Sequence, residues 1–203
     1  MEQSDKNIDL KLGIDTEGVE INNVHCKENG YYEPIPYAVL DRLIKENIVT
    51  SNSKLIDFGS GKGRVAVYLA KKLGAYVWGI EYDAKLIETA NKNADICGVT
   101  NSVQFLHMNV RETELDQFPS MNQCYFYNPF SMEIFCEVIS KITEYADLHK
   151  RSVELILFYP TLQYVRALLK NHKITYVREV DLSDFFGKNR ARACIMCFEV
   201  KPD

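Results

Sequence analysis

The chain has 203 residues, of which 46% are hydrophobic and 26% charged, and 24 Lys and Arg against 28 Asp and Glu give a net charge of −4. This composition is typical of a soluble globular domain and excludes disordered, collagen-like and coiled-coil chains. The mild negative charge argues against nucleic-acid binding through bulk electrostatics, and no apolar stretch reaches the roughly 18 residues of a membrane span.

The first 36 residues are acidic, with eight Asp or Glu against three Lys. Their hydrophobic periodicity is weak, so we expect an N-terminal extension over residues 1–36 that is partly flexible. It should become ordered near residues 31–36 and line a cleft there. Pro34 and Pro36 disfavour a helix before them, and a helix can begin after Pro36. The polar start of the chain is unlike a signal peptide. We therefore expect a cytoplasmic protein.

From residue 54 short apolar runs alternate with amphipathic stretches that predict helices. Alternation of this kind predicts an α/β fold with a doubly wound, mostly parallel sheet and helices on both faces. The last two strands have only a loop between them, so one strand should be antiparallel. We therefore expect a single seven-stranded domain over residues 37–203. The predicted strands cover residues 55–58, 76–80, 103–108, 124–127, 155–159, 174–182 and 193–200.

The six cysteines are sparse for a chain of this length, and most lie in apolar or periodic stretches. We expect reduced, buried thiols of a cytoplasmic protein. Cys194 and Cys197 have the spacing of a redox motif, but they lie in a predicted strand. Residues three apart on a strand point to opposite faces, which argues against disulfide or metal chemistry there. No metal site is predicted.

A glycine-rich loop follows the first predicted strand. Gly59, Gly61 and Gly63 allow a tight turn and a close approach of a ligand to the backbone. A dinucleotide fingerprint requires its third glycine where this chain has Arg64. Glu81 ends the next strand, where a carboxylate can accept hydrogen bonds from a ribose diol. A tight strand–helix turn without a ligand is the alternative for the loop taken alone.

At these residues the chain resembles class I S-adenosylmethionine-dependent methyltransferases. The resemblance rests on residues 55–64 (LIDFGSGKGR), on residues 79–83 (GIEYD) and on Asn128 at the fourth strand end, and it covers about residues 31–200. It implies a seven-stranded sheet whose seventh strand is antiparallel. It also implies S-adenosylmethionine as the cofactor and S-adenosylhomocysteine as the product.

The resemblance further implies roles for individual residues. The glycine loop would pack on the methionine part of the cofactor, Asp57 would hold its amino group, and Glu81 would bind the ribose. Tyr82 would flank the adenine. Asn109 stands where the family usually has Asp, and its side-chain oxygen can still accept a hydrogen bond. The cofactor-binding residues implied in this way are Tyr32, Asp57, Gly59, Ser60, Gly61, Gly63, Glu81, Tyr82, Asn109, Val110 and Asn128.

Asn128, Pro129 and Phe130 occupy the position where the family delivers the methyl group, and they are the predicted catalytic residues. Family members that methylate planar amino groups carry Asn/Asp-Pro-Pro-Tyr/Phe there, and this chain has one proline fewer. A role confined to shaping the loop is the alternative. Tyr31, Tyr37 and Phe130 are the predicted acceptor-binding residues, with helix-entry packing as the alternative for the tyrosines.

The sequence therefore predicts a methyltransferase that acts by in-line displacement on a nitrogen of a protein or small molecule, as a monomer or homodimer away from membranes. The alternatives are a cofactor-binding protein without catalysis and a nucleotide-dependent oxidoreductase. Tyr127, Glu33 and Tyr159 are candidate neighbours of the acceptor. The basic stretch 166–192 is interpreted as a solvated surface, with an anchor for an acidic or nucleic-acid substrate as the alternative.

Overall fold

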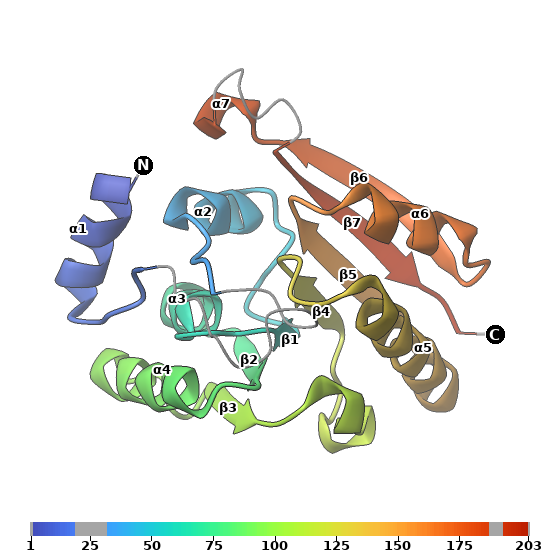
Figure 1. The fold of residues 1–203 in the computed structure, drawn as a ribbon, viewed down its shortest axis with the longest axis horizontal. Helices are drawn as coiled ribbons and strands as arrows, with labels where there is room; N and C mark the ends of the chain where they lie inside the picture. The colour runs from blue at the N-terminus through green and yellow to red at the C-terminus, as the bar shows by residue number, and fades with distance from the viewer. Residues whose placement is uncertain (1, 19–31, 187–192, 203) are drawn as a thin grey trace.

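The computed structural model describes residues 2–18, 32–186 and 193–202, and these contain one seven-stranded sheet with the order β3-β2-β1-β4-β5-β7-β6 (Figure 1). β7 pairs antiparallel with both β5 and β6, and the remaining pairs are parallel. The predicted mostly parallel sheet with one antiparallel strand is confirmed. The strands are β1 (Lys54–Phe58), β2 (Tyr76–Glu81), β3 (Val103–His107), β4 (Gln123–Phe126), β5 (Val153–Phe158), β6 (Ile174–Asp181) and β7 (Cys194–Val200).

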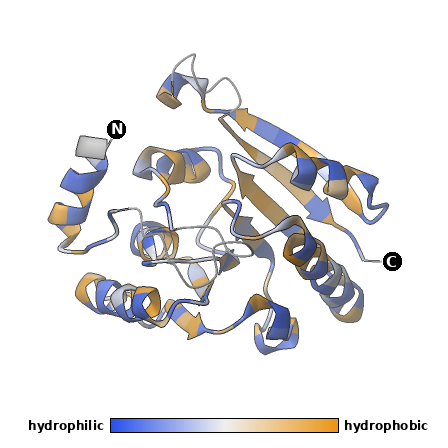
Figure 2. Cartoon of the chain, viewed as in Figure 1, coloured by the Kyte–Doolittle hydropathy of each residue, from blue (hydrophilic) through white to orange (hydrophobic). Residues whose placement is uncertain are grey.

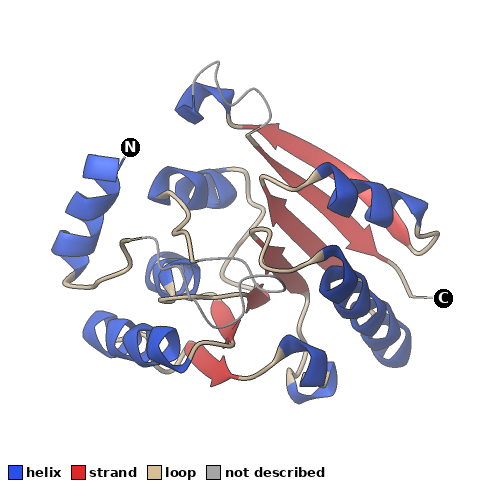
Figure 3. Cartoon of the chain, in the orientation of Figure 1, coloured by secondary structure: helices blue, strands red, loops and turns tan. Residues whose placement is uncertain are grey.

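Helices cover both faces of this sheet, so that strands form the middle layer (Figure 3). On one face α2 (Tyr37–Lys45), α3 (Arg64–Leu73) and α4 (Ala84–Cys97) share a hydrophobic core with the strands. On the other face α5 (Met132–His149) and α6 (Leu162–Lys170) form a second core. The helices carry both hydrophobic and hydrophilic residues (Figure 2), as expected for elements that bury one side.

Short elements complete the fold. Two 3₁₀ helices, η1 (Val110–Glu112) and η2 (Leu115–Gln117), connect β3 to β4. A four-residue helix, α7 (Ser183–Phe186), follows β6, where the sequence predicts a loop without a helix. Its apolar Phe185 and Phe186 pack against the first core. A helix of four residues is too short to show a hydrophobic period in the sequence, so it could not be predicted.

The chain begins with a helix that the sequence does not predict, α1 (Glu2–Leu12). Ile8 and Leu12 of α1 pack against the first core, and its buried side also carries Asp5 and Asp9. A helix that buries carboxylates shows little apolar periodicity in its sequence. This is why the sequence predicts a partly flexible extension in place of α1. The division of the chain at residue 36 stays a prediction.

Among the described residues, no helix combines the length and apolar character that crossing a membrane requires. The same ranges contain no group of three or more His, Cys, Asp or Glu able to hold a metal ion. Of the described cysteines, Cys97, Cys124 and Cys197 are buried, Cys194 is half-buried and Cys136 is exposed, and all are free thiols.

Candidate functional site

The candidate site lies at the carboxyl ends of β1, β2 and β4. β1 pairs with β2 on one side and with β4 on the other. From β1 the strand order continues to β2 and β3 in one direction and to β4 and β5 in the other, so the order reverses between β1 and β4. In open α/β sheets, ligands bind beyond the strand ends at such a reversal of order. The glycine loop and Asn128 follow β1 and β4, and Glu81 is the last residue of β2, so the fold brings the predicted motifs to one edge.

The glycine loop turns sharply because its alternate glycines adopt left-handed backbone conformations. Gly59, Gly61 and Gly63 have φ values of 78°, 53° and 82°. The amides of Gly59 and Ser60 both donate to the carbonyl of Ile80, at 2.9 and 3.0 Å. These two bonds tie the end of β1 to the end of β2.

The same glycines also make room for three aromatic or proline side chains. A Cβ atom on Gly61 would lie 2.3 Å from the Tyr32 ring, and one on Gly59 would lie 2.7 Å from Pro129. A Cβ atom on Gly63 would lie 2.4 Å from Phe105 of β3. The loop therefore contacts the β3 and β4 sides of the site as well as Tyr32 from the N-terminal part of the chain.

Glu81 is held in a fixed position by the backbone around it. Its Oε2 accepts from the amide of Gly61 (3.0 Å), and its Oε1 accepts from the amides of Tyr82 (2.8 Å) and Asp83 (2.9 Å). Burial raises the pKa of the Glu81 carboxyl, while these hydrogen bonds oppose that rise. A carboxylate has about four acceptor sites, so three amide bonds leave capacity for a ligand hydroxyl.

A group of buried polar atoms without hydrogen-bond partners lies at the end of β1. It comprises Asp57 Oδ2, Ser60 Oγ and the hydroxyl of Tyr125, whose residue is the β4 neighbour of Asp57 in the sheet register. Burial raises the pKa of Asp57 to about 8, and the nearby Glu81 adds to this. Buried polar groups normally find partners, so unpaired ones at a ligand-binding edge indicate a polar ligand.

Asn109, Val110 and Tyr82 lie at the ends of β2 and β3, on the same edge as Glu81. Asn109 Oδ1 accepts from the amide of Arg111 at 3.0 Å and begins η1. Val110 is buried, whereas Tyr82 has 48% of its surface exposed. Nε2 of His107 lies 2.9 Å from the carbonyl oxygen of Tyr82, which joins the ends of β2 and β3.

Asn128 connects the ends of β4 and β5 with its side chain. Its Nδ2 donates to the carbonyl of Tyr159 at 2.8 Å, and its Oδ1 accepts from the amide of Thr161 at 3.2 Å. Asn128 and Tyr159 both have left-handed backbones, with φ values of 44° and 48°. For non-glycine residues this conformation is strained and occurs often at functional sites.

Phe130 is also tied to the β5 side. The hydroxyl of Tyr164 donates to the Phe130 carbonyl at 2.6 Å, and the Phe130 ring packs edge-on against Phe58 of β1 at 6.3 Å between centroids. Pro129 contacts Gly59, as described above. The predicted catalytic residues thus form a rigid connection between the glycine loop and α6, with the Asn128 amide directed to the protein itself.

The predicted tyrosines are distributed differently. Tyr32 lies against Gly61, at the candidate site. Tyr37 has no exposed surface, and its hydroxyl donates to Asp9 at 2.5 Å, so in this structure it packs in the core at the start of α2. Tyr31 lies outside the described residues. Tyr159 is 38% exposed at the end of β5.

Two residues at the site were missed by sequence reasoning. Tyr125 becomes visible only through its register with Asp57, because strand neighbours cannot be read from strand order along the chain. In the sequence Arg64 only ends the glycine-rich motif and departs from the dinucleotide fingerprint. Its buried side chain binds the N-terminal part of the chain, a partner to which no local pattern points.

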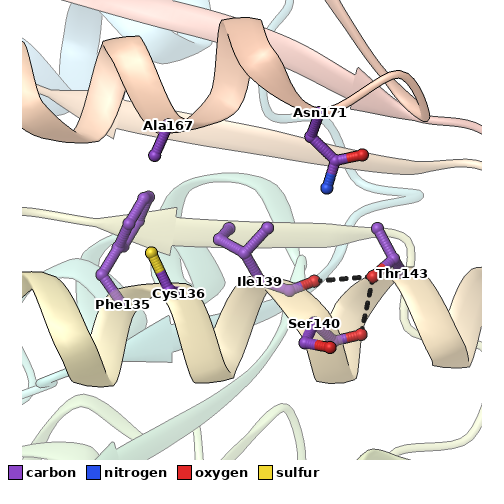
Figure 4. A pocket seen from close by; sticks show the side chains of 7 residues that line it. All are labelled: Phe135, Cys136, Ile139, Ser140, Thr143, Ala167 and Asn171. Carbon is purple, nitrogen blue, oxygen red and sulfur yellow. Dashed lines mark hydrogen bonds between the residues drawn. The ribbon is translucent and has the colours of Figure 1, made fainter.

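A surface pocket also lies away from the strand ends, between α5 and α6 (Figure 4). Within it the Thr143 hydroxyl bonds back to the carbonyls of Ile139 and Ser140 in its own helix. None of the predicted site residues lines it. Its lining residues are Phe135, Cys136, Ile139, Ser140, Thr143, Ala167 and Asn171.

Two basic residues of the predicted basic stretch 166–192 bind other parts of the chain. Lys173 pairs with Asp147 at 2.5 Å, and Arg178 donates to the Glu46 carbonyl at 3.2 Å. Lys188, Arg190 and Arg192 lie outside the described residues. The two described pairs are consistent with structural roles for these two cations.

Residues 55–130, which contain the glycine loop, Glu81 and Asn128, match the sequence profile of a family described as a methyltransferase domain. This match covers less than half of the chain, at the segment that contains the candidate site, and supports the resemblance to methyltransferases. The structure agrees with the resemblance, which implied a seven-stranded sheet whose seventh strand is antiparallel. Of the predicted elements, the sheet and its helix layers are confirmed.

Two curated methyltransferases share sequence with this part of the chain. A release factor glutamine methyltransferase from Flavobacterium psychrophilum is 38% identical over 80 residues, 37% of this chain and 27% of that protein. A tRNA (uracil(54)-C(5))-methyltransferase from Pyrococcus furiosus is 32% identical over 93 residues, 46% of this chain and 22% of that protein. The matched segments span about a quarter of the length of these relatives.

Solved methyltransferase structures resemble more of the chain. An RNA methyltransferase from Salinibacter ruber, in complex with S-adenosyl-L-homocysteine, has a TM-score of 0.61 and 22% identity, covering 84% of this chain and 95% of that chain. A human methyltransferase 10 domain containing protein has a TM-score of 0.66 and 14% identity, covering 98% and 95%. At these identities the similarity concerns the class I methyltransferase fold.

Proposed function

We propose that this chain is an S-adenosylmethionine-dependent methyltransferase. The observation that carries the proposal is the set of carboxylates and unpaired buried polar atoms around the glycine loop. Glu81 is fixed by three backbone amides, and Asp57 Oδ2 and Ser60 Oγ are buried without partners. These groups suit a ligand that combines a cationic amino group with hydroxyl groups.

The donor and acceptor chemistry fits the proposed cofactor. Asp57 supplies a buried carboxyl that would hold the amino group, and Glu81 retains acceptor capacity for the ribose hydroxyls. Gly61 has no Cβ, so the Tyr32 ring packs directly against the loop, where it would line the cofactor site. Asn109 and Val110 would lie beside the adenine.

For methyl transfer the main task of the protein is to align the acceptor with the cofactor. The bound cofactor would supply a sulfonium-activated methyl group. The residues of this chain then have to hold the acceptor in line with the reactive bond, which is the main contribution of a rigid site. The Asn128–Tyr159 and Tyr164–Phe130 hydrogen bonds supply that rigidity at the β4 end.

We further propose a nitrogen acceptor, on the basis of Asn128, Pro129 and Phe130. The names of the two curated relatives specify a release-factor glutamine in one case and a tRNA uracil carbon in the other. Because one of these names specifies an RNA acceptor and the other a protein acceptor, they do not support the expectation that a protein or small molecule is favoured over nucleic acid.

Calorimetry with S-adenosylhomocysteine tests cofactor binding. We expect the full chain to bind it, Glu81→Ala to lose at least about tenfold in affinity through loss of charge-assisted hydrogen bonds, and Glu88→Ala to bind like the parent. Glu88 is a matched control because it is an exposed carboxylate on α4 that pairs with Lys92. Absence of binding by the parent chain contradicts the proposal, and so does equal binding by Glu81→Ala.

Transfer of a labelled methyl group from S-adenosylmethionine into a cell extract tests catalysis. Fractionation into protein, nucleic acid and small molecules identifies the acceptor class, and chemical analysis of the product identifies the methylated atom. Label on oxygen or carbon contradicts the nitrogen proposal. Tight binding without transfer to any fraction favours a binding protein without catalysis.

A further inference from the structure

Arg64, the first residue of α3, carries a buried guanidinium directly after the glycine loop. Its side chain is only 3% exposed. Nε donates to Thr16 Oγ1 at 2.6 Å, Nη2 to the Thr16 carbonyl at 3.3 Å, and Nη1 to the Ile35 carbonyl at 2.9 Å. The hydrogen-bond acceptors of this guanidinium therefore come from the chain before α2, and not from the sheet.

Two carboxylates of α1 face the same guanidinium. Asp5 Oδ2 lies 3.7 Å from Nη1 and Asp9 Oδ2 lies 3.6 Å from Nη2 of Arg64. Their spacing of four residues puts them on one side of α1. A cation at the first position of a helix is disfavoured by the helix dipole, and the nearby carboxylates offset that cost.

Thr16 joins this cluster to Tyr32. Asp9 Oδ2 accepts from the Thr16 amide at 2.8 Å, which fixes the backbone of Thr16 beside Arg64. The Thr16 carbonyl, which already accepts from Arg64, also accepts from the Tyr32 hydroxyl at 2.6 Å. One carbonyl thus receives both the guanidinium from α3 and the phenol that covers Gly61.

The Tyr32 ring packs against the glycine loop. It lies so close to Gly61 that a Cβ atom there would be 2.3 Å away, and the Lys62 ammonium is 5.6 Å from the ring centroid. Lys62 also donates to the Glu17 carbonyl at 2.8 Å, next to Thr16. Residues 16 and 17 therefore hold both Tyr32 and the middle of the loop.

We propose that Arg64 is a positioning residue for the cofactor site, which acts through Asp9 and Thr16 to hold Tyr32 against Gly61. Residues 2–18 and Tyr32 then form one wall of the site, and their order sets the affinity for the cofactor. This inference rests on the proposed function, because its readout is binding of S-adenosylhomocysteine.

The test is a double-mutant cycle between Arg64→Leu and Tyr32→Ala, with S-adenosylhomocysteine affinity measured by calorimetry. Arg64→Leu should weaken binding at least about threefold in the parent chain and have no further effect when Tyr32 is already Ala, since coupled residues are non-additive. Hydrogen exchange of residues 2–18 should become faster in Arg64→Leu.

Arg42→Met is the matched control. Arg42 is also a largely covered arginine at 18% exposure, and it pairs with Asp184 of α7 at 2.6 Å, away from the glycine loop. It should leave affinity and exchange of residues 2–18 unchanged. Equal affinity losses by Arg64→Leu in both Tyr32 backgrounds would indicate a merely structural role and overturn the inference, as would no loss at all.

Tyr32→Phe provides a milder test if Arg64→Leu does not fold. It removes only the hydroxyl that bonds to the Thr16 carbonyl. It should lower the affinity while leaving the thermal midpoint of unfolding unchanged, and parent-like affinity would overturn the inference. A parent chain that does not bind S-adenosylhomocysteine would instead contradict the proposed function, so the two failures are distinct.

Discussion

The loops after β1 and β4 meet at one edge of the sheet but are built in opposite ways. The β1 loop uses glycines at its left-handed positions, where they cost little, and its Ser60 Oγ is unpaired, as is Oδ2 of Asp57 at the end of β1. The β4 loop uses Asn128 at a left-handed position, where strain is expected, and both ends of its amide are bonded within the protein.

The difference separates two tasks. Unpaired buried polar atoms are costly until a ligand satisfies them, so the β1 loop is suited to binding. A strained residue persists only when its surroundings fix it, so the β4 loop is suited to holding a geometry. Changes in the first loop should act mainly on affinity, and changes in the second mainly on stability and turnover.

Gly61→Val should have the largest effect and abolish measurable binding of S-adenosylhomocysteine. A β-branched residue at a φ of 53° costs roughly 1–3 kcal/mol of stability, and its Cβ would meet the Tyr32 ring at 2.3 Å. Gly74→Ala is the control, since Gly74 has a φ of 73° with nothing within 4 Å of a Cβ atom. It should lose stability and keep affinity; calorimetry and urea unfolding measure both.

Asp57→Asn should weaken the binding of S-adenosylhomocysteine and raise the stability of the folded chain at pH 8. The pKa of Asp57 is raised to about 8 in the folded chain from an ordinary 3.8. The unfolded chain therefore loses this proton first, and the contribution of Asp57 to stability falls as pH rises from about 4 to about 8. The variant should be more stable than the parent at pH 8, with the difference vanishing below pH 4 in urea unfolding.

The same residue predicts a pH-dependent affinity. Asp57 must ionise to hold a cationic amino group, so binding of S-adenosylhomocysteine by the parent should strengthen from pH 6 to pH 8. The curve for Asp57→Asn should be flat and weaker. Exposed Asp95 on α4 offers the control Asp95→Asn, which should follow the parent. Parallel curves for the parent and Asp57→Asn would contradict this role.

Substitutions of Asn128 should give the smallest effects and separate strain from hydrogen bonding. Both Asn128→Gly and Asn128→Ala lose the two side-chain bonds, at a cost of about 1–3 kcal/mol. Alanine also tolerates a φ of 44° less well than glycine, so it should be the less stable variant in urea unfolding. Methyl transfer should fall in both, with S-adenosylhomocysteine affinity nearly unchanged.

Asn47 is the control for this pair. It has a φ of 53° just after α2, at the opposite end of the sheet from the glycine loop. Its Gly and Ala variants should show the same order of stability without a change in turnover. Loss of cofactor affinity in Asn128→Gly comparable to that in Gly61→Val would break the proposed division of tasks between the two loops.

Most of the fold could be predicted because the sheet buries apolar strands between amphipathic helices. Leu55, Ile56 and Phe58 in β1 are nearly inaccessible, and such runs are visible in the sequence. α1 could not be predicted, since its buried side includes Asp5 and Asp9. These carboxylates are buried where the Arg64 guanidinium faces them, and Arg64 lies 59 positions after Asp5 and 55 after Asp9.

The candidate site was predictable where the backbone imposes the residue type. Gly59, Gly61 and Gly63 stand where left-handed turns and close neighbours exclude side chains, so their spacing is informative. Tyr125 was not predictable, because its relation to Asp57 depends on which strands pair. The two hydrogen bonds of the Asn128 side-chain amide also could not be predicted, because their partners, Tyr159 and Thr161, follow β5.

The Arg64 cluster has a consequence for the order in which the chain is made. Asp5, Asp9 and Thr16 leave the ribosome well before Arg64, which follows Thr16 by 48 positions. Until α3 has emerged, α1 has no buried cation to pack against, and a helix of this length is marginal on its own in water. Docking of α1 is therefore expected to wait until α3 has been made.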